Sequence, residues 1–118
     1  MEYTLEKPEV YNLAESFSDE IWNIVIEWKI FLRDTIGKQI VRSADSISSN
    51  IAECYGRYYY KESKQFYFYS RGSIQETKSW LSKCGRRGII EPEKYFKLFA
   101  ASKNRMPWFT VKILIAFM

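Results

Sequence analysis

Apolar residues recur at helical spacing along most of this chain, and strand-type alternation is nowhere sustained. The first helix signal is Ser16 followed by Asp19 and Glu20. Serine caps free N–H groups at a helix start, and acidic side chains there interact favourably with the helix dipole. Apolar positions follow at intervals of four, three and four: Ile21, Val25, Trp28 and Leu32. The pattern predicts a first helix over residues 16–34.

A second helix is predicted over residues 36–56. Asp34 or Thr35 can cap its start, and Gly56 is a plausible left-handed residue at its end. The same rhythm of apolar spacing marks its buried face, which is formed by Ile40, Ala44, Ile47, Ile51 and Tyr55.

The third helix is predicted over residues 61–84, ending before Gly85. It carries two apolar stripes, so it must pack against more than one neighbour. One stripe is a heptad seam of Tyr67, Ile74 and Leu81, completed by Ser70, Thr77 and Cys84. The other consists of Phe66, Tyr69, Ser73 and Trp80.

A fourth helix is predicted over residues 92–105, with Pro92 in the first turn, where proline is tolerated. Its apolar residues are Tyr95, Phe96, Leu98 and Phe99, and Pro107 should end or kink it. The tail 106–118 lacks clean helical spacing and is left unassigned. Connections of about two to six residues place successive helices antiparallel to one another. The chain, residues 1–118, is therefore expected to be all-α, a single antiparallel up-down-up-down four-helix bundle.

The segment 43–57, SADSISSNIAECYGR, has helical spacing but carries serines where a core helix would carry large apolar residues. One interpretation is a solvated face with local ion pairs. The other is a polar network that another helix approaches closely, since Gly72 and Ser73 are also small and lie at the middle of the third helix. The internal pattern alone does not decide between these two interpretations.

The net charge of +4 is unevenly distributed. Residues 1–35 carry three Lys/Arg against eight Asp/Glu, whereas residues 36–90 carry ten against four. Neighbouring helices could neutralise each other, or the basic part could bind a polyanion such as RNA or DNA. The block 55–69 interleaves aromatic and basic residues, which suits base stacking, although tyrosines are also common in cores and subunit interfaces. The candidate nucleic-acid contacts are Arg57, Lys61, Lys64, Arg86 and Arg87.

Catalytic chemistry has little support in the sequence. The chain contains no histidine, so a cysteine–histidine nucleophile and a Glu-x-x-His di-iron site are both impossible. Cys54 and Cys84 are expected to be free thiols in a reducing cytosol. We expect no enzyme activity, no cofactor and no metal. The start lacks an export signal and the most apolar run, 106–118, is too short to span a bilayer, so a cytoplasmic protein without a membrane segment is expected.

Two blocks, TIGKQIVRSADSISSNIAECYGR (35–57) and FYFYSRGSIQETKSWL (66–81), resemble the bacterial four-helix bundle family of 23S rRNA intervening-sequence proteins. The resemblance covers about residues 15–100. The matching residues are Gln39, Arg42, Ser43, Ser46, Asn50, Ile51, Ala52, Glu53, Gly56, Arg57, Arg71, Gly72, Ser73 and Glu76. Two departures stand out: Cys54 occupies a usual glycine position, and the tail after about Ser102 differs from the usual continuation of the fourth helix.

The resemblance implies an antiparallel four-helix bundle that assembles into a homopentamer, encoded within ribosomal RNA loci. A related protein, the accessory variability determinant of diversity-generating retroelements, is a basic pentamer that binds nucleic acid and a reverse transcriptase. The resemblance also favours close approach at the serine-rich helix, with Ser46 and Asn50 buried and hydrogen-bonded across to the third helix, and Glu53 and Arg57 nearer the rim. The structural network that it implies comprises Arg42, Ser43, Ser46, Asn50, Glu53, Arg71, Ser73 and Glu76.

Two hypotheses follow for the function. The first is a non-enzymatic homo-oligomer whose basic surface binds RNA or DNA. The second is a protein–protein interaction scaffold without direct nucleic-acid contact, in which the positive charge serves an acidic partner or the acidic first helix of another subunit.

Overall fold

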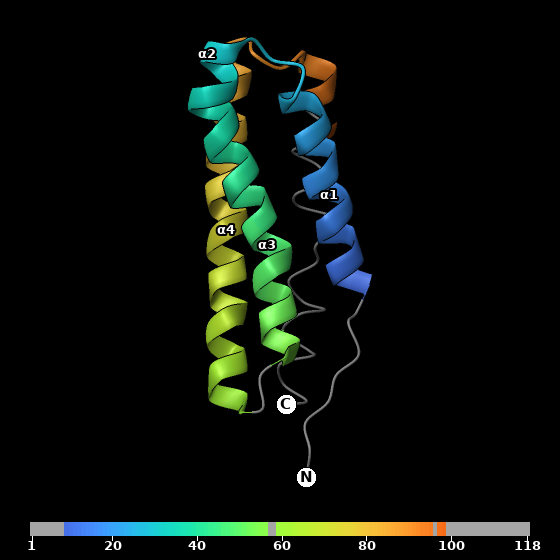
Figure 1. Ribbon diagram of the computed structural model, residues 1–118, viewed down its shortest axis with the longest axis vertical. Helices are drawn as coiled ribbons and strands as arrows, with labels where there is room; N and C mark the ends of the chain where they lie inside the picture. Colours follow the sequence, from blue (N-terminus) through green and yellow to red (C-terminus); the bar gives the residue numbers. More distant parts are fainter. Residues whose placement is uncertain (1–8, 57–58, 96, 99–118) are drawn as a thin grey trace.

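The computed structural model describes residues 9–56, 59–95 and 97–98, and every regular element in these ranges is helical. Helices α1 (Glu9–Val25) and α2 (Ile30–Leu32) are followed by the π-helical segment η1 (Arg33–Gly37), α3 (Lys38–Gly56) and α4 (Tyr60–Arg86). Residues 92–95 and 97–98 are also helical. The all-α prediction is confirmed for these ranges (Figure 1). Most of the predicted fourth helix 92–105, and all of the tail 106–118, lie outside the described residues.

Helix α1 differs from the prediction at both ends. It is already helical at Glu9, so Ser16 lies inside it rather than capping it, and it ends at Val25 rather than near residue 34. The chain then turns, with Trp28 N–H donating to the Val25 carbonyl over 2.9 Å. The sequence predicted a longer helix because Trp28 continues the apolar spacing. Trp28 does pack against the core, but from the turn that follows α1.

The predicted cap of the second helix is also wrong. Helical structure begins at Ile30 and runs through the π turn of η1 into α3 without an interruption at Asp34 or Thr35. The Thr35 hydroxyl donates back to the Phe31 carbonyl over 2.6 Å, which is an interaction of a residue inside a helix. Gly56 is the last residue of α3, as predicted. It is not left-handed as expected, because Gly88 is the single glycine of the described residues with a positive φ.

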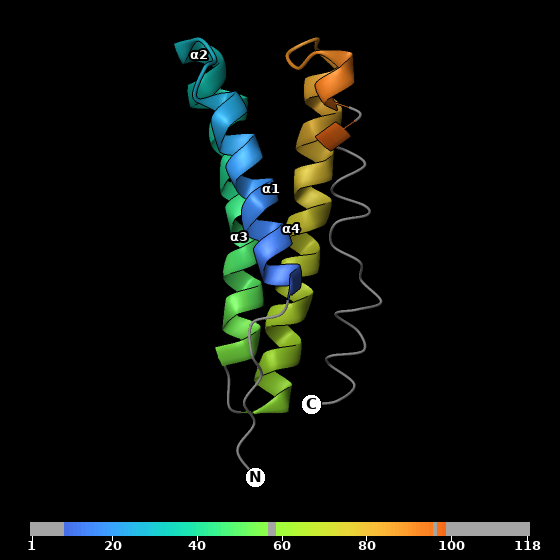
Figure 2. The same ribbon diagram turned by 90° about the vertical axis from the view of Figure 1, so that its right-hand side faces the viewer.

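Helices α3 and α4 lie side by side along the length of the molecule (Figure 2). Thr77 of α4 donates to the Ser43 hydroxyl over 2.9 Å, and Ser70 donates to the Ile47 carbonyl over 3.0 Å. Because the position on α4 falls as the position on α3 rises, the two helices run in opposite directions. The predicted apolar faces are confirmed: Ile40, Ala44, Ile47, Ile51 and Tyr55 of α3 are buried, as are Tyr67, Ile74 and Leu81 of α4.

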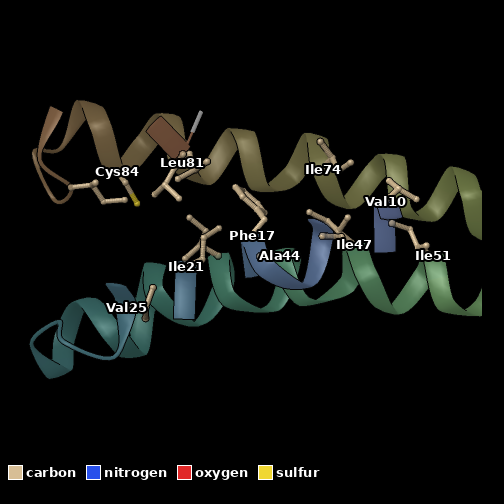
Figure 3. Close-up of a cluster of buried hydrophobic side chains, with 14 of the residues drawn as sticks. Val10, Phe17, Ile21, Val25, Ala44, Ile47, Ile51, Ile74, Leu81 and Cys84 are labelled. Atoms are coloured by element: carbon tan, nitrogen blue, oxygen red, sulfur yellow. The ribbon is translucent and has the colours of Figure 1, made fainter. Parts of the chain in front are cut away.

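Helix α1 covers the groove between α3 and α4. Figure 3 shows Phe17 and Ile21 lying between the two helices, where both side chains are buried. The buried Ser18 hydroxyl also donates to the carboxylate of Asp45 on α3. This hydrogen bond between α1 and α3 was not anticipated from the sequence.

The end of α4 lies two residues beyond its predicted limit. Gly88 adopts a φ of 68°, the Ile89 N–H donates to the Cys84 carbonyl over 2.9 Å, and the Gly88 N–H donates to the Gly85 carbonyl over 3.2 Å. These two bonds form a Schellman motif. Gly85, the predicted terminator, lies inside α4, where a Cβ would come within 2.9 Å of the Tyr95 ring. Gly85 therefore lets residues 92–95 pack closely on α4.

Candidate nucleic-acid interface

The contact between α3 and α4 contains buried hydroxyl groups. Ser43, Ser70 and Thr77 are buried there, where Thr77 donates to Ser43 and Ser70 donates to the Ile47 carbonyl. The small side chains let the helix axes approach, and hydrogen bonds across the seam or to the nearest turn offset much of the loss of water. The helices do approach closely, at Ser43 and Ile47 of α3, but the predicted polar network of the serine-rich segment is not what joins them.

The prediction named the wrong residues for this close approach. The Ser46 hydroxyl donates to the Arg42 carbonyl over 2.9 Å, and the Asn50 amide donates to the Ser46 carbonyl over 2.8 Å. Both side chains are only half-buried and bond within α3 instead of across to α4. Gly72 is exposed, and no atom lies within 4 Å of where its Cβ would be, so it does not create the contact. Ser43 and Ser70 occupy the places that Ser46 and Gly72 were expected to fill.

Most residues of the proposed structural network lie at the surface. Ser43 is buried, and Ser46, Asn50 and Ser73 are half-buried. The Ser73 hydroxyl donates to the Tyr69 carbonyl over 3.1 Å, within its own helix. The four charged members are exposed: Arg42, Glu53, Arg71 and Glu76.

The candidate nucleic-acid contacts divide between the two ends of α4. Lys61 and Lys64 are exposed in its first two turns, and Arg86 and Arg87 are exposed at its other end. With a rise of about 1.5 Å per residue, Lys61 and Arg86 lie about 37 Å apart along the helix. Arg57 lies outside the described residues. The four described cations therefore do not form one compact cluster.

Two further cations on α4 connect these ends. Lys61, Lys64, Arg71, Lys78 and Arg86 fall, with Phe68, Gln75 and Ser82 between them, at helical spacings of three or four residues. We call these five cations the α4 stripe. Arg71 is exposed and Lys78 is half-buried, and within the described residues none of the five is paired with a carboxylate.

The acidic residues of α4 lie away from this stripe. Glu62 and Glu76 fall more than about 100° around the helix from its centre, so no carboxylate interrupts the row of positive charge. The exposed Phe68 ring lies within the row, and Lys64 Nζ is 6.0 Å from its centroid. From the sequence, Arg71 was expected in a structural network and Lys78 had no predicted role. The three–four spacing of the cations was the signal that could have joined them.

The aromatic block 55–69 divides between core and surface. Tyr55 and Tyr67 are buried, whereas Tyr59, Phe68 and Tyr69 are exposed. Burial raises the pKa of Tyr67, and the nearby Arg71 guanidinium opposes this shift. The core interpretation therefore holds for Tyr55 and Tyr67, and Phe68 is the exposed ring that lies on the α4 stripe.

Both cysteines are free and buried, as expected. Burial raises the pKa of Cys54 to about 11; it also raises that of Cys84 to about 11, where Arg87 acts in the opposite direction. The described residues hold no cluster of metal-ligating side chains. Over the same ranges, none of the helices combines the length and apolar character needed to cross a bilayer.

Comparisons with known proteins agree with this architecture. One solved structure, a protein with unknown function from the S23 ribosomal protein family of Bacteroides thetaiotaomicron, is similar with a TM-score of 0.74 and 25% sequence identity. The similarity covers 92% of this chain and 93% of that one. A search of curated proteins found no match. Residues 6–106 match the family described as 23S rRNA-intervening sequence protein, and the chain therefore belongs to that family.

Proposed function

We propose that this protein is a non-catalytic RNA- or DNA-binding protein that contacts phosphates through the α4 stripe. The observation that supports the proposal is five cations along one helix face without an intervening carboxylate. Their span of about 37 Å is close to one turn of duplex, about 34–36 Å. A row of cations at this spacing favours phosphate contacts along a backbone rather than readout of bases. The family description, which refers to 23S rRNA, is consistent with an RNA ligand.

The test is to remove the centre of the stripe, Arg71→Gln with Lys78→Gln, and to measure binding to a labelled duplex by fluorescence anisotropy at several salt concentrations. Each lost phosphate contact reduces the slope of log K against log salt by about 0.9 on B-form DNA, so the double variant should lose roughly two units. A matched control, Lys29→Gln with Lys97→Gln, removes two exposed cations outside the stripe and should keep the slope. Equal slopes in both variants would refute a role for the stripe.

The same proposal includes the complete assembly. It comprises an up-down-up-down four-helix bundle and a homo-oligomer, a pentamer by family resemblance. Exposed apolar side chains support self-association, because Ile30 and Phe31 are more than half exposed in a single chain. Native mass spectrometry measures the number of copies directly. A monomer at micromolar concentration contradicts this part of the proposal and leaves the α4 stripe unaffected.

The second candidate is a protein–protein scaffold without direct nucleic-acid contact. It is favoured by the exposed carboxylates Asp19 and Glu27, which a second copy could pair with Arg86 and Arg87. In that case Arg86→Ala with Arg87→Ala would break the oligomer and leave RNA retention unchanged. Weaker RNA binding by an intact oligomer would favour the first candidate.

A further inference from the structure

A hollow of about 690 Å³ is lined by residues from the end of α1, from η1 and from the start of α3. These elements lie at the upper end of the molecule in Figure 1. Val25 and Val41 contribute to the apolar lining of the hollow. We call it the π-turn hollow, because Arg33, Asp34 and Gly37 of η1 line it. Its described lining comes from α1, the following turn, η1 and α3, so it is separate from the α4 stripe.

The π turn explains why so many residues of one helical segment face the same hollow. In a regular α-helix every fourth position drifts by about 40°, so residues 33 and 41 would point about 80° apart. The wider turn of η1 removes part of that drift. Two rows of residues, 33–37–41 and 34–38–42, consequently line the hollow together. Gly37 has no side chain, which leaves space for Val25 of α1.

The charges around the hollow favour an anion. Arg33, Lys38 and Arg42 are exposed, and their side chains form no hydrogen bond or ion pair within the part of the chain that the structure describes. Asp34 is the one carboxylate among the described lining residues. The hollow therefore has a local excess of two positive charges.

Trp22 forms part of the wall, with 52% of its surface exposed. An indole beside a group of unpaired cations suits a ligand with a flat aromatic part and a negative part. The volume falls within the roughly 300–1,000 Å³ that is usual for small-ligand sites. A partner helix would instead need an apolar groove, whereas four of the nine described lining residues here are charged.

We propose that the π-turn hollow binds a nucleoside phosphate. The base stacks on Trp22, and the phosphate lies among Arg33, Lys38 and Arg42, where the guanidinium groups can form paired hydrogen bonds to its oxygens. The ligand is either a free nucleotide or one nucleotide of a single strand, since both present the same chemistry. The α4 stripe has no part in this site, so the two proposals fail independently.

Isothermal titration of the full-length protein tests the site, with ADP as the probe. Adenosine supplies the base without charge, and inorganic pyrophosphate supplies charge without the base. We expect ADP to bind at least about tenfold more tightly than either, because stacking and charge both contribute. Pyrophosphate that binds as tightly as ADP would reduce the hollow to a simple anion site and overturn the proposal. Failure to detect ADP binding at millimolar concentration would do the same.

Variants separate this site from general charge effects. Trp22→Leu and Arg42→Gln should each weaken ADP binding about tenfold, whereas the controls Phe31→Leu and Lys97→Gln should leave it unchanged. All four positions are exposed, and circular dichroism checks the fold. Equal loss in variants and controls would overturn the site.

A 5′-phosphorylated tetradeoxyadenylate distinguishes the two sources of the ligand. Tighter binding than ADP, lost in Trp22→Leu, indicates a strand, whereas weaker binding indicates a free nucleotide. An acidic peptide, tetraglutamate, that binds when ADP does not would reject a nucleotide ligand in favour of a protein partner.

Discussion

Gly37 provides a direct test of how α1 packs against the start of α3. A Cβ at this position would lie 2.7 Å from Val25 Cγ1, 3.1 Å from the Leu32 carbonyl oxygen and 3.3 Å from Trp28 Cε3. Val25 is buried, and a backbone oxygen cannot rotate away, so the added methyl has little room. Gly37→Ala should therefore force a shift of α1 or of η1.

The expected magnitude comes from two opposing terms. Overpacking of this kind costs about 1–3 kcal/mol. Replacing glycine by alanine within a helix stabilises the folded state by about 1 kcal/mol. The net expectation for Gly37→Ala is a loss of about 0–2 kcal/mol in the free energy of unfolding. Because the two terms overlap, a matched control is needed to isolate the contact.

Gly72→Ala is that control. Gly72 lies in the middle of α4, is exposed, and has no atom within 4 Å of where its Cβ would be. Gly72→Ala should gain only the higher helix propensity of alanine, and it should stabilise the protein by about 1 kcal/mol. The two variants should therefore differ by about 1–3 kcal/mol, measured by urea unfolding with far-UV circular dichroism. Protein concentration must be held equal, because self-association would add to stability.

Val25→Ala identifies the contact that resists the methyl group. Combined with Gly37→Ala it removes the nearest atom, so the pair should show a favourable coupling of at least about 0.5 kcal/mol in a double-mutant cycle. A Gly37→Ala variant as stable as Gly72→Ala, or a cycle without coupling, would refute the packing of α1 against η1 described above.

Two further predictions concern the buried seam and the cysteines. Thr77→Val removes the hydroxyl that donates to Ser43 and should lower the free energy of unfolding by about 1–2 kcal/mol. Ser79→Ala, at an exposed position, is a neutral control. Equal stabilities of the two variants would contradict the cross-helix bond. With pKa values of about 11 instead of 9.0, the Cys54 and Cys84 thiolates should be roughly 100-fold scarcer at pH 8 than ordinary thiolates, so Ellman's reagent should react slowly until urea unfolds the chain. Because the unfolded thiols lose their protons first, stability should fall as pH rises from about 9 to about 11, and a rise over that window would contradict thiol burial as the cause.

For the candidate interface, the sequence identified the cations but not their arrangement. Lys61, Lys64 and Arg86 are exposed as a basic surface requires. Arg71 and Lys78 belong with them because all five follow one row of α4, which runs beside the buried face of Tyr67, Ile74 and Leu81. That grouping depends on which face of a two-striped helix is covered. The helix carries more than one apolar stripe, and its sequence does not rank them.

The sequence by itself determined the helical class and the inward faces of α3 and α4. Ile40, Ile47, Ile74 and Leu81 are buried as their spacing indicates, because periodicity along a single helix records which side leaves water. It left open whether the serines of α3 face water or another helix.

Only the tertiary structure decided where the first helix ends and how the next one begins. The turn after Val25, the π turn of η1 and the choice of Ser43 over Ser46 each depend on contacts between segments that are distant in the sequence. Local spacing allowed one helix to continue from Val25 to Leu32. The packing of Val25 and Trp28 against Gly37 is possible only after the chain has turned back on itself, and burial in that contact outweighs the local preference to remain helical.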